Sequence, residues 1–175
     1  TPERAQRSRH AAVRCRAILE DTRELSRLLR PQVLDDLGLQ AALNWLLRTL
    51  AEPGGFEAEM HIDAGLPKLG EEASTMLFRV AQEALNNIAR HARARHVVLR
   101  LHARDQHVHL LVMDDGIGCD AEHAVQRSSR GEATGLAAMR ERVQLFGGML
   151  QFASQPGEGT QLRVSLPLEL LEDIR

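Results

Sequence analysis

Residues 108–118 of this 175-residue chain have the sequence VHLLVMDDGIG and are the most informative stretch for predicting its fold. The almost wholly apolar run 108–113 predicts a buried strand, and Asp114 stands where that strand ends. An acid at a strand end can accept a hydrogen bond from an exocyclic amine, and glycines such as Gly116 and Gly118 let the backbone approach a ligand closely. Taken alone, the stretch is a weak indication of a site, because Asp-Gly turns are common.

A second strand is expected directly before this one, over residues 96–102. The residues between the two strands, 103–107, fit a hairpin turn. His102, His107 and His109 surround this hairpin and could approach one another. We interpret them as exposed strand histidines in preference to a metal site.

The segment before the hairpin predicts a helix over residues 71–91. Its buried face would consist of six apolar or small residues, Leu77, Val80, Ala81, Ala84, Leu85 and Ile88. Helical spacing places Glu83, Asn87 and Arg90 or His91 together on one face. A carboxylate, an amide and a cation can hold Mg²⁺ and the oxygens of a triphosphate, because hard cations prefer oxygen ligands. Spacing alone favours the plainer alternative, an amphipathic helix with a solvated polar face.

On the other side of the opening stretch, residues 119–134 are polar and lack a hydrophobic period, which predicts a mobile loop. Long loops in compact domains are often functional. The run 131–143, GEATGLAAMRERV, then leads into a helix expected over residues 135–146. Backbone N–H groups at a helix N-terminus favour anions such as phosphate, although a glycine that caps a purely structural helix fits the run as well.

Three further segments predict strands. Residues 149–154 and 161–166 would pair around the turn 157–160, GEGT, which by itself is only a hairpin turn. Residues 56–62 alternate in polarity, as a half-buried strand does. Helices mixed with paired strands indicate an α+β two-layer sandwich, in which helices cover one face of a mixed sheet.

Two helices are expected upstream of these strands. A helix over residues 34–51 would carry Asp35 and Asp36 in its first turn, where acids suit the helix dipole, and Pro53-Gly54-Gly55 would break the chain after it. Its apolar side would be Leu39, Ala42, Leu43, Leu46, Leu47 and Leu50. Residues 4–30 predict a long N-terminal helix with the narrow apolar seam of a helical bundle or coiled coil, and Pro31 would end it.

Composition excludes several classes of protein. A formal charge of −2, from 22 basic and 24 acidic residues, argues against a dedicated nucleic-acid binder. Two distant cysteines, Cys15 and Cys119, form no disulfide framework, so a reducing, cytoplasmic location is expected. We expect no membrane contact by this stretch, because it holds neither a run of about 18 apolar residues nor a signal peptide. The P-loop, the dinucleotide GxGxxG and the metalloprotease HExxH are all missing.

In their order along the chain, the four motifs resemble the catalytic ATP-binding domain of bacterial sensor histidine kinases. That domain belongs with the gyrase, Hsp90 and MutL ATPases, the GHKL superfamily with the Bergerat-type fold. The runs 29–31 (LRP), 34–39 (LDDLGL) and 139–143 (MRERV) are similar to the nitrate-sensor-like subfamily. The usual partners of that subfamily are response regulators with a LuxR-like DNA-binding output domain.

The resemblance covers essentially the whole chain and implies two parts. Residues 1–33 would be the second helix of a dimerisation and phosphotransfer hairpin, so that the intact kinase is a homodimer. Residues 34–170 would be the ATP-binding catalytic domain, with an ATP lid at about 119–134.

The resemblance also implies a role for each motif residue. Asp114 would accept a hydrogen bond from the adenine amino group, and Gly116 and Gly118 would line the base pocket. Asn87 would ligate Mg²⁺, and Glu83 would support the metal or polarise a nearby water.

Further positions follow for the phosphates, the lid and the base. Arg90 and His91 would reach the phosphates of ATP, and Thr160 would lie near the adenine. The closing end of the lid would contribute Gly135 and Leu136 to ATP binding.

The chain departs from the family pattern in two places. The lid usually closes with Gly-x-Gly-Leu, but residues 133–136 read ATGL, and the Cβ of Ala133 disfavours a positive φ. The family's phosphoacceptor histidine is followed directly by an acid, whereas two alanines follow His10. We therefore interpret His10 as a solvated residue and expect this stretch to bind Mg-ATP without phosphorylating itself.

Two alternatives stay open at this point. One is an anti-sigma-factor-type Ser/Thr kinase of the same fold. The runs 29–31 and 139–143 are evidence against it. The other is a nucleotide-binding-deficient interaction module that acts through its helix seam, which Ala133 supports and Asp114 and Asn87 oppose. Anchoring of an intact protein in the inner membrane by an upstream sensor region stays open as well.

Overall fold

The computed structural model describes residues 32–122 and 134–170. Three expectations lie outside these ranges: the helix over residues 4–30, the solvated His10, and lid residues 123–133.

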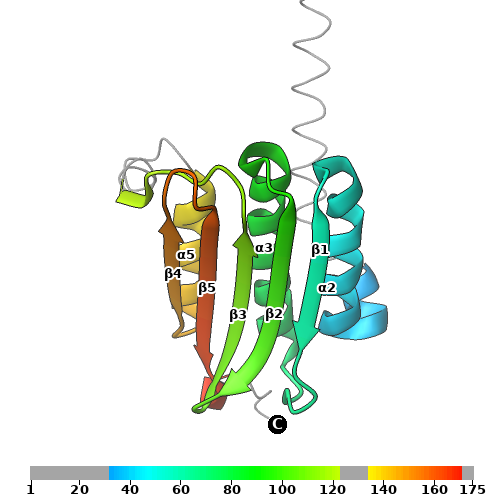
Figure 1. Cartoon of the computed structure of the whole chain (residues 1–175). Helices are drawn as coiled ribbons and strands as arrows, with labels where there is room; N and C mark the ends of the chain where they lie inside the picture. The colour runs from blue at the N-terminus through cyan, green and yellow to red at the C-terminus, as the bar shows by residue number, and fades with distance from the viewer. Residues whose placement is uncertain (1–31, 123–133, 171–175) are drawn as a thin grey trace, which may run out of the picture.

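Five strands form one mixed sheet in the order β1-β2-β3-β5-β4 (Figure 1). At one edge β1 (Glu57–Ile62) runs parallel to β2 (His96–Arg104), and the remaining neighbours pair antiparallel. These are β3 (His107–Asp114), β5 (Thr160–Pro167) and β4 (Met149–Ser154). A parallel pair needs a crossover connection, which the helix between β1 and β2 supplies.

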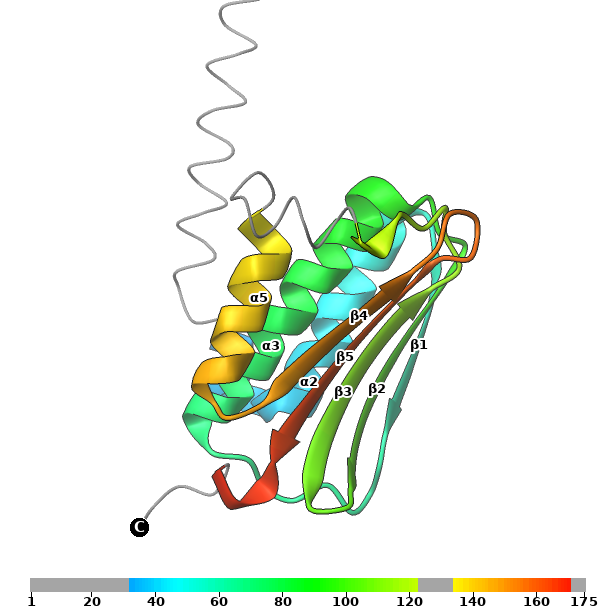
Figure 2. The same ribbon diagram turned by 90° about the vertical axis from the view of Figure 1, so that its left-hand side faces the viewer.

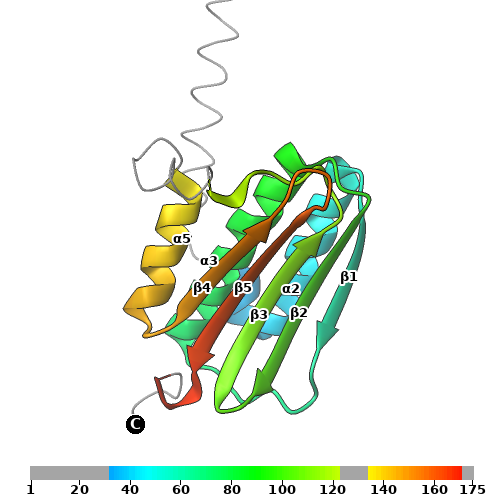
Figure 3. The same ribbon diagram turned by 60° about the vertical axis from the view of Figure 1, so that its left-hand side comes forward.

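Three helices cover one face of the sheet: α2 (Gln32–Gly54), α3 (Glu71–Asn87) and α5 (Thr134–Leu145) (Figure 2). None of these helices lies on the opposite face (Figure 3). The α+β sandwich with a mixed sheet covered on one face is therefore confirmed.

The core lies between these two layers. Alternate residues of each central strand point into it, such as Leu99 of β2, Leu110 of β3 and Val164 of β5, all fully buried. All six residues predicted for the buried face of the helix over residues 71–91 are buried, and so are five of the six predicted for α2, the exception being the half-buried Leu50. The spacing of apolar residues in the sequence thus identified the helix faces that pack in the core.

The turn between β2 and β3 contains only Asp105 and Gln106, with φ values of 51° and 60°. Two consecutive positive φ values are typical of the type I′ turn, whose twist matches that of a hairpin. Because the turn is so short, β2 extends to Arg104 and β3 starts at His107, slightly beyond the predicted strand ends.

The helix predicted over residues 34–51 differs from α2 in geometry. Gly38 has φ 77° and ψ 175°, so two helical segments meet at a kink there. Asp35 lies in the first turn of α2, as predicted, and Asp36 follows it, but both belong to the short segment before the kink. The helix also passes through Pro53 to Gly54.

The end of the helix predicted over residues 71–91 differs too. α3 ends at Asn87, and Ile88–Ala92 form a π-helical turn, after which Arg93 takes the left-handed conformation with φ 50°. π-Helical turns close their hydrogen bonds over one more residue than an α-helix and often occur at functional sites. The side chains of Arg90 and His91 therefore do not follow the α-helical spacing from which their common face with Glu83 and Asn87 was predicted.

Candidate functional site

Asp114 is the only buried polar or charged residue in the described part of the chain, with 8% of its surface exposed. Its Oδ1 accepts a hydrogen bond of 2.8 Å from the N–H of Gly116. Its Oδ2 is buried without a hydrogen-bond partner, and no other buried side-chain nitrogen or oxygen of the described residues is in that position. Burial raises the pKa of Asp114, while the Gly116 N–H and the nearby polar groups of Thr160 oppose that shift.

A buried carboxylate oxygen without a donor costs about 1–3 kcal/mol or more. Such an atom in a native structure calls for an explanation. A ligand that brings a hydrogen-bond donor, such as the exocyclic amine of adenine, supplies one.

Thr160 lies directly across the β3–β5 pair from Asp114, so the structure brings these two predicted residues together. The Thr160 hydroxyl lies 3.1 Å from the Ser154 hydroxyl oxygen. Ser154 in turn donates to the carbonyl of Gly159 and accepts from the N–H of Cys119. This polar cluster fixes the strand ends beside Asp114.

Gly116 and Gly118 are both crowded by backbone. A Cβ on Gly116 would meet the carbonyl oxygen of Ala92. Gly118 has φ 58°, and a Cβ there would collide with the carbonyl oxygens of Gln155 and Gly159. The structure thus requires glycine at both positions to pass close to the chain's own backbone, and their contact with a ligand stays a prediction.

Glu83 and Asn87 of α3 lie next to Gly135 at the start of α5. A Cβ on Gly135 would stand 2.5 Å from Glu83 Oε1 and 3.7 Å from Asn87 Nδ2. The carboxylate, the amide and a helix N-terminus therefore lie close together. Leu136, the next residue, packs against the core, whereas Ala133 lies outside the described residues.

Arg90 and His91 lie in the π-helical turn that follows Asn87, and both are exposed to solvent. The turn is connected to the loop that carries Asp114, because the N–H of Ile117 donates to the carbonyl of Ala92 at 2.7 Å. The two predicted cations therefore sit on a segment that is bonded directly to the predicted base-binding loop.

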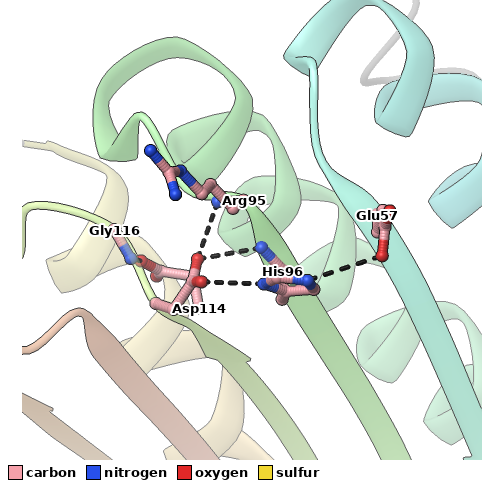
Figure 4. Close-up of polar contacts among 6 residues, drawn as sticks. Glu57, Arg95, His96, Asp114 and Gly116 are labelled. Atoms are coloured by element: carbon pink, nitrogen blue, oxygen red, sulfur yellow. Dashed lines mark hydrogen bonds and ion pairs between the residues drawn. The ribbon is translucent and has the colours of Figure 1, made fainter.

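No role was predicted from the sequence for Asp115, whose carboxylate lies beside Arg95 and His96, both of which Figure 4 labels. Its Oδ1 accepts from the backbone N–H groups of Arg95 and His96, at 2.7 and 2.8 Å, and its Oδ2 lies 2.9 Å from His96 Nδ1. On the far side of the imidazole, His96 Nε2 lies 3.4 Å from Glu57 Oε2.

These contacts shift both pKa values. Hydrogen bonds from the backbone and side chain of His96 lower the pKa of Asp115 to about 2. The hydrogen bond to Asp115 and the charges of Asp115, Glu57 and Glu59 raise the pKa of His96. The only sequence signal was the second acid of the Asp-Asp-Gly run, since its partners lie about twenty positions away.

The three hairpin histidines stack, with ring centroids 5.0 Å apart for His102–His109 and 6.0 Å for His107–His109. Burial and the neighbouring His102 lower the pKa of His109. Among residues 32–122 and 134–170, no group of three or more His, Cys, Asp or Glu side chains is arranged to hold a metal ion. The same residues contain no helix long and apolar enough to span a membrane.

Comparison with known proteins identifies the family of the chain. Residues 72–170 match the family described as histidine kinase-, DNA gyrase B-, and HSP90-like ATPase. The chain is 39% identical over 149 residues to the sensor histidine kinase MctS of Rhizobium johnstonii, covering 85% of this chain and 32% of that protein. It is 37% identical over 151 residues to the histidine-protein kinase/phosphatase UhpB of Salmonella typhimurium, covering 86% of this chain and 29% of UhpB.

Solved structures show the same fold. The histidine kinase domain of a blue-light activated kinase from Erythrobacter litoralis aligns with a TM-score of 0.61 and 23% identity, over 77% of this chain and 69% of that one. The histidine kinase AdeS of Acinetobacter baumannii aligns with a TM-score of 0.65 and 15% identity, over 89% and 84%. The family match covers more than half of the chain, and the predicted resemblance is confirmed: the chain belongs to the histidine kinase-, DNA gyrase B- and HSP90-like ATPase family.

Proposed function

We propose that this chain is the ATP-binding catalytic domain of a sensor histidine kinase. The observation that carries the proposal is the buried, unpartnered Oδ2 of Asp114 at the end of β3, in a chain whose relatives are sensor histidine kinases. A carboxylate there accepts a hydrogen bond from the amino group of adenine. It repels the carbonyl oxygen that guanine presents at the equivalent position, so the site selects adenine nucleotides.

The convergence of Glu83, Asn87 and Gly135 supports the phosphate end of the site. The oxygens of Glu83 and Asn87 would hold Mg²⁺, since this ion prefers oxygen ligands, and Glu83 has the alternative task of polarising a water. The backbone N–H groups at the start of α5 favour phosphate, as do the exposed Arg90 and His91. Leu136 fixes this helix start by packing against the core.

Mg-ATP supplies the phosphoryl group and part of the charge neutralisation that transfer requires. Catalysis of phosphoryl transfer rests mostly on positioning and electrostatic stabilisation. In this domain the base would be held by Asp114, with Thr160 and the two glycines beside it. The phosphates would be held near α3 and α5, and the γ-phosphoryl would pass to a histidine on a dimerisation helix.

The remaining parts of the proposal rest on the resemblance and the relatives. The chain spans 32% of MctS and 29% of UhpB, so the acceptor helix and the sensor belong to regions beyond this stretch. The phosphoryl group would then pass to an aspartate of a response regulator with a LuxR-like output domain. The domain would work in the cytoplasm as part of a homodimer, with residues 1–33 in its dimerisation hairpin.

Calorimetric titration with Mg-ATP and Mg-GTP tests the proposal. Wild-type protein should bind the adenine nucleotide and reject the guanine nucleotide, and Asp114→Ala should lose that selectivity. Asp105→Ala, an exposed aspartate at the opposite end of β3, is the matched control and should bind as the wild type does. Absence of binding by the wild type would favour the interaction module, and equal binding by Asp114→Ala would refute the site.

A further inference from the structure

The two walls of the proposed base site come from separate parts of the chain. One wall is the segment 88–96, which holds the π-helical turn and the start of β2, and the other is the loop 114–118. Two main-chain hydrogen bonds join them, from Ile117 N–H to the Ala92 carbonyl at 2.7 Å and from Asp115 N–H to the His96 carbonyl at 3.2 Å. Any side chain that holds these walls together also sets the position of Asp114 relative to the π-helical turn.

Asp115 is that side chain. It accepts hydrogen bonds from the backbone N–H groups of Arg95 and His96, at the start of β2, and contacts the His96 ring. All three contacts form although 45% of the Asp115 side chain and 59% of the His96 side chain are exposed. The partners lie on the opposite wall, so the carboxylate bridges the two segments.

His96 lies among several charged groups. Asp115 approaches Nδ1 and Glu57 of β1 approaches Nε2, with Glu59 further along β1. Glu52 of α2 and Arg95 line the same open cavity of about 540 Å³ as Glu57 and His96. Acids outnumber cations around this imidazole.

We propose that Asp115 and His96 form a positioning pair that joins the base-binding loop to the π-helical turn, and that nucleotide affinity rises when His96 carries a proton. The inference rests on the proposed function, because it assumes that the nucleotide lies between these walls. Neither residue touches the nucleotide in this proposal; both act through the position of Asp114 and of the segment that carries Arg90 and His91.

The protonation dependence follows from the donors of imidazole. A neutral ring has one N–H and can donate to only one of its two carboxylate neighbours, whereas the protonated ring donates from both nitrogens. The proton therefore strengthens the contact to Asp115 without loss of the contact to Glu57. A nucleotide that binds best when the walls are joined favours the same state, so proton and nucleotide support each other's binding.

Titration with Mg-ADP between pH 5.5 and 8.5 tests the pair. Asp115→Asn should weaken binding about tenfold at pH 6, which corresponds to the loss of one charge-assisted hydrogen bond. His96→Gln should weaken binding about threefold at pH 6 and by little at pH 8.5. The matched controls are Asp105→Asn in the hairpin turn and His61→Gln on β1, and both should bind as the wild type does at each pH.

At each pH, the dissociation constant of His96→Gln is divided by that of the wild type. Protonation of the nucleotide itself affects both proteins equally, so it cancels from this ratio. A ratio that stays constant with pH would overturn the protonation step, and wild-type affinity in Asp115→Asn would overturn the pair. If Asp115→Asn unfolds, the pH profile of the folded His96→Gln decides the question. A wild type that binds no Mg-ADP at any pH would overturn the proposed function together with this inference, whereas binding with unaltered variants overturns the inference alone.

Discussion

Gly135 lies against the carboxylate of Glu83, so closely that a Cβ at position 135 would stand 2.5 Å from Glu83 Oε1. The relationship joins the start of α5 to the polar face of α3. Two motifs that are more than forty residues apart in the sequence thus meet at one point of the structure.

Substitution of Gly135 tests this contact. In Gly135→Ala the Cβ would displace the flexible end of the Glu83 side chain, so the free energy of unfolding should change by less than about 1 kcal/mol. Affinity for Mg-ATP should fall by about fivefold to tenfold if Glu83 supports the Mg²⁺ as proposed, because the carboxylate would be displaced from that position. Calorimetry and thermal unfolding measure the two effects. Gly65→Ala, where a Cβ meets nothing within 4 Å, should alter neither.

Asp114→Asn should stabilise the fold while it weakens nucleotide binding. The raised pKa of Asp114 means that its ionisation disfavours the folded state, since stability from such a group is complete below its unfolded pKa and is lost as pH rises through the folded value. The neutral amide removes this cost at pH 7 but turns a donor toward the adenine amine. We expect a higher melting temperature and roughly 10-fold to 100-fold weaker binding of Mg-ATP. A lower melting temperature would contradict the account of the unpartnered oxygen.

Two effects make Gly118 necessary for stability, its positive φ and the close backbone around it, and a pair of variants separates their contributions. Gly118→Ala combines a strained backbone at φ 58° with collisions against two carbonyl oxygens, and it should destabilise the fold by more than about 2 kcal/mol. Gly38→Ala has a similar strain at φ 77° but meets nothing within 4 Å, so it should cost only about 1 kcal/mol. Urea unfolding measures the free energy of unfolding of both variants. Equal decreases in the two would show that the backbone around position 118 relaxes without cost.

Asp115 should make a pH-dependent contribution to the stability of the fold. Its pKa of about 2 lies below the ordinary value of 3.8, so its stabilising contribution is complete above 3.8 and is lost as pH falls toward 2. The difference in unfolding free energy between wild type and Asp115→Asn should therefore shrink over that interval. Urea titrations at a series of pH values measure it, with Asp105→Asn as the comparison whose difference should stay small throughout.

The contribution of His96 to stability should have the opposite pH dependence to that of Asp115. Its pKa is raised above 6.5, so its stabilising contribution is complete below 6.5 and is lost as pH rises through the folded value. The unfolding free energy of wild type relative to His96→Gln should decline as pH rises above 6.5. A difference that grows with pH would contradict the contacts to Asp115 and Glu57.

The sequence predicted those features that depend on local spacing. Apolar runs and, for residues 56–62, alternation of polarity located the five strands. The i, i+3, i+4 pattern identified the buried faces of α2 and α3, because burial of one face dictates that spacing. The polar turn residues 103–107 located the hairpin between β2 and β3. The order of the four motifs indicated the family, which the comparison confirms.

The features that were missed depend on tertiary contacts. The π-helical turn at Ile88–Ala92 has no distinct spacing, and its Ala92 carbonyl is held by Ile117 from a distant loop. The kink at Gly38 leaves the apolar pattern unbroken on both sides. Asp115 looked like one half of a common Asp-Gly turn, and only the fold shows that β2 begins beside it.

The edge position of β1 has a consequence for solubility. Among the described residues, β1 pairs on one side only, with β2, and an unpaired strand edge is a template on which other chains can aggregate. Every second residue of β1 is ionisable and exposed, in the order Glu57, Glu59 and His61. A foreign strand that paired here would bring its side chains against this row of ionisable residues, so this edge of the sheet is protected against fibrillar growth.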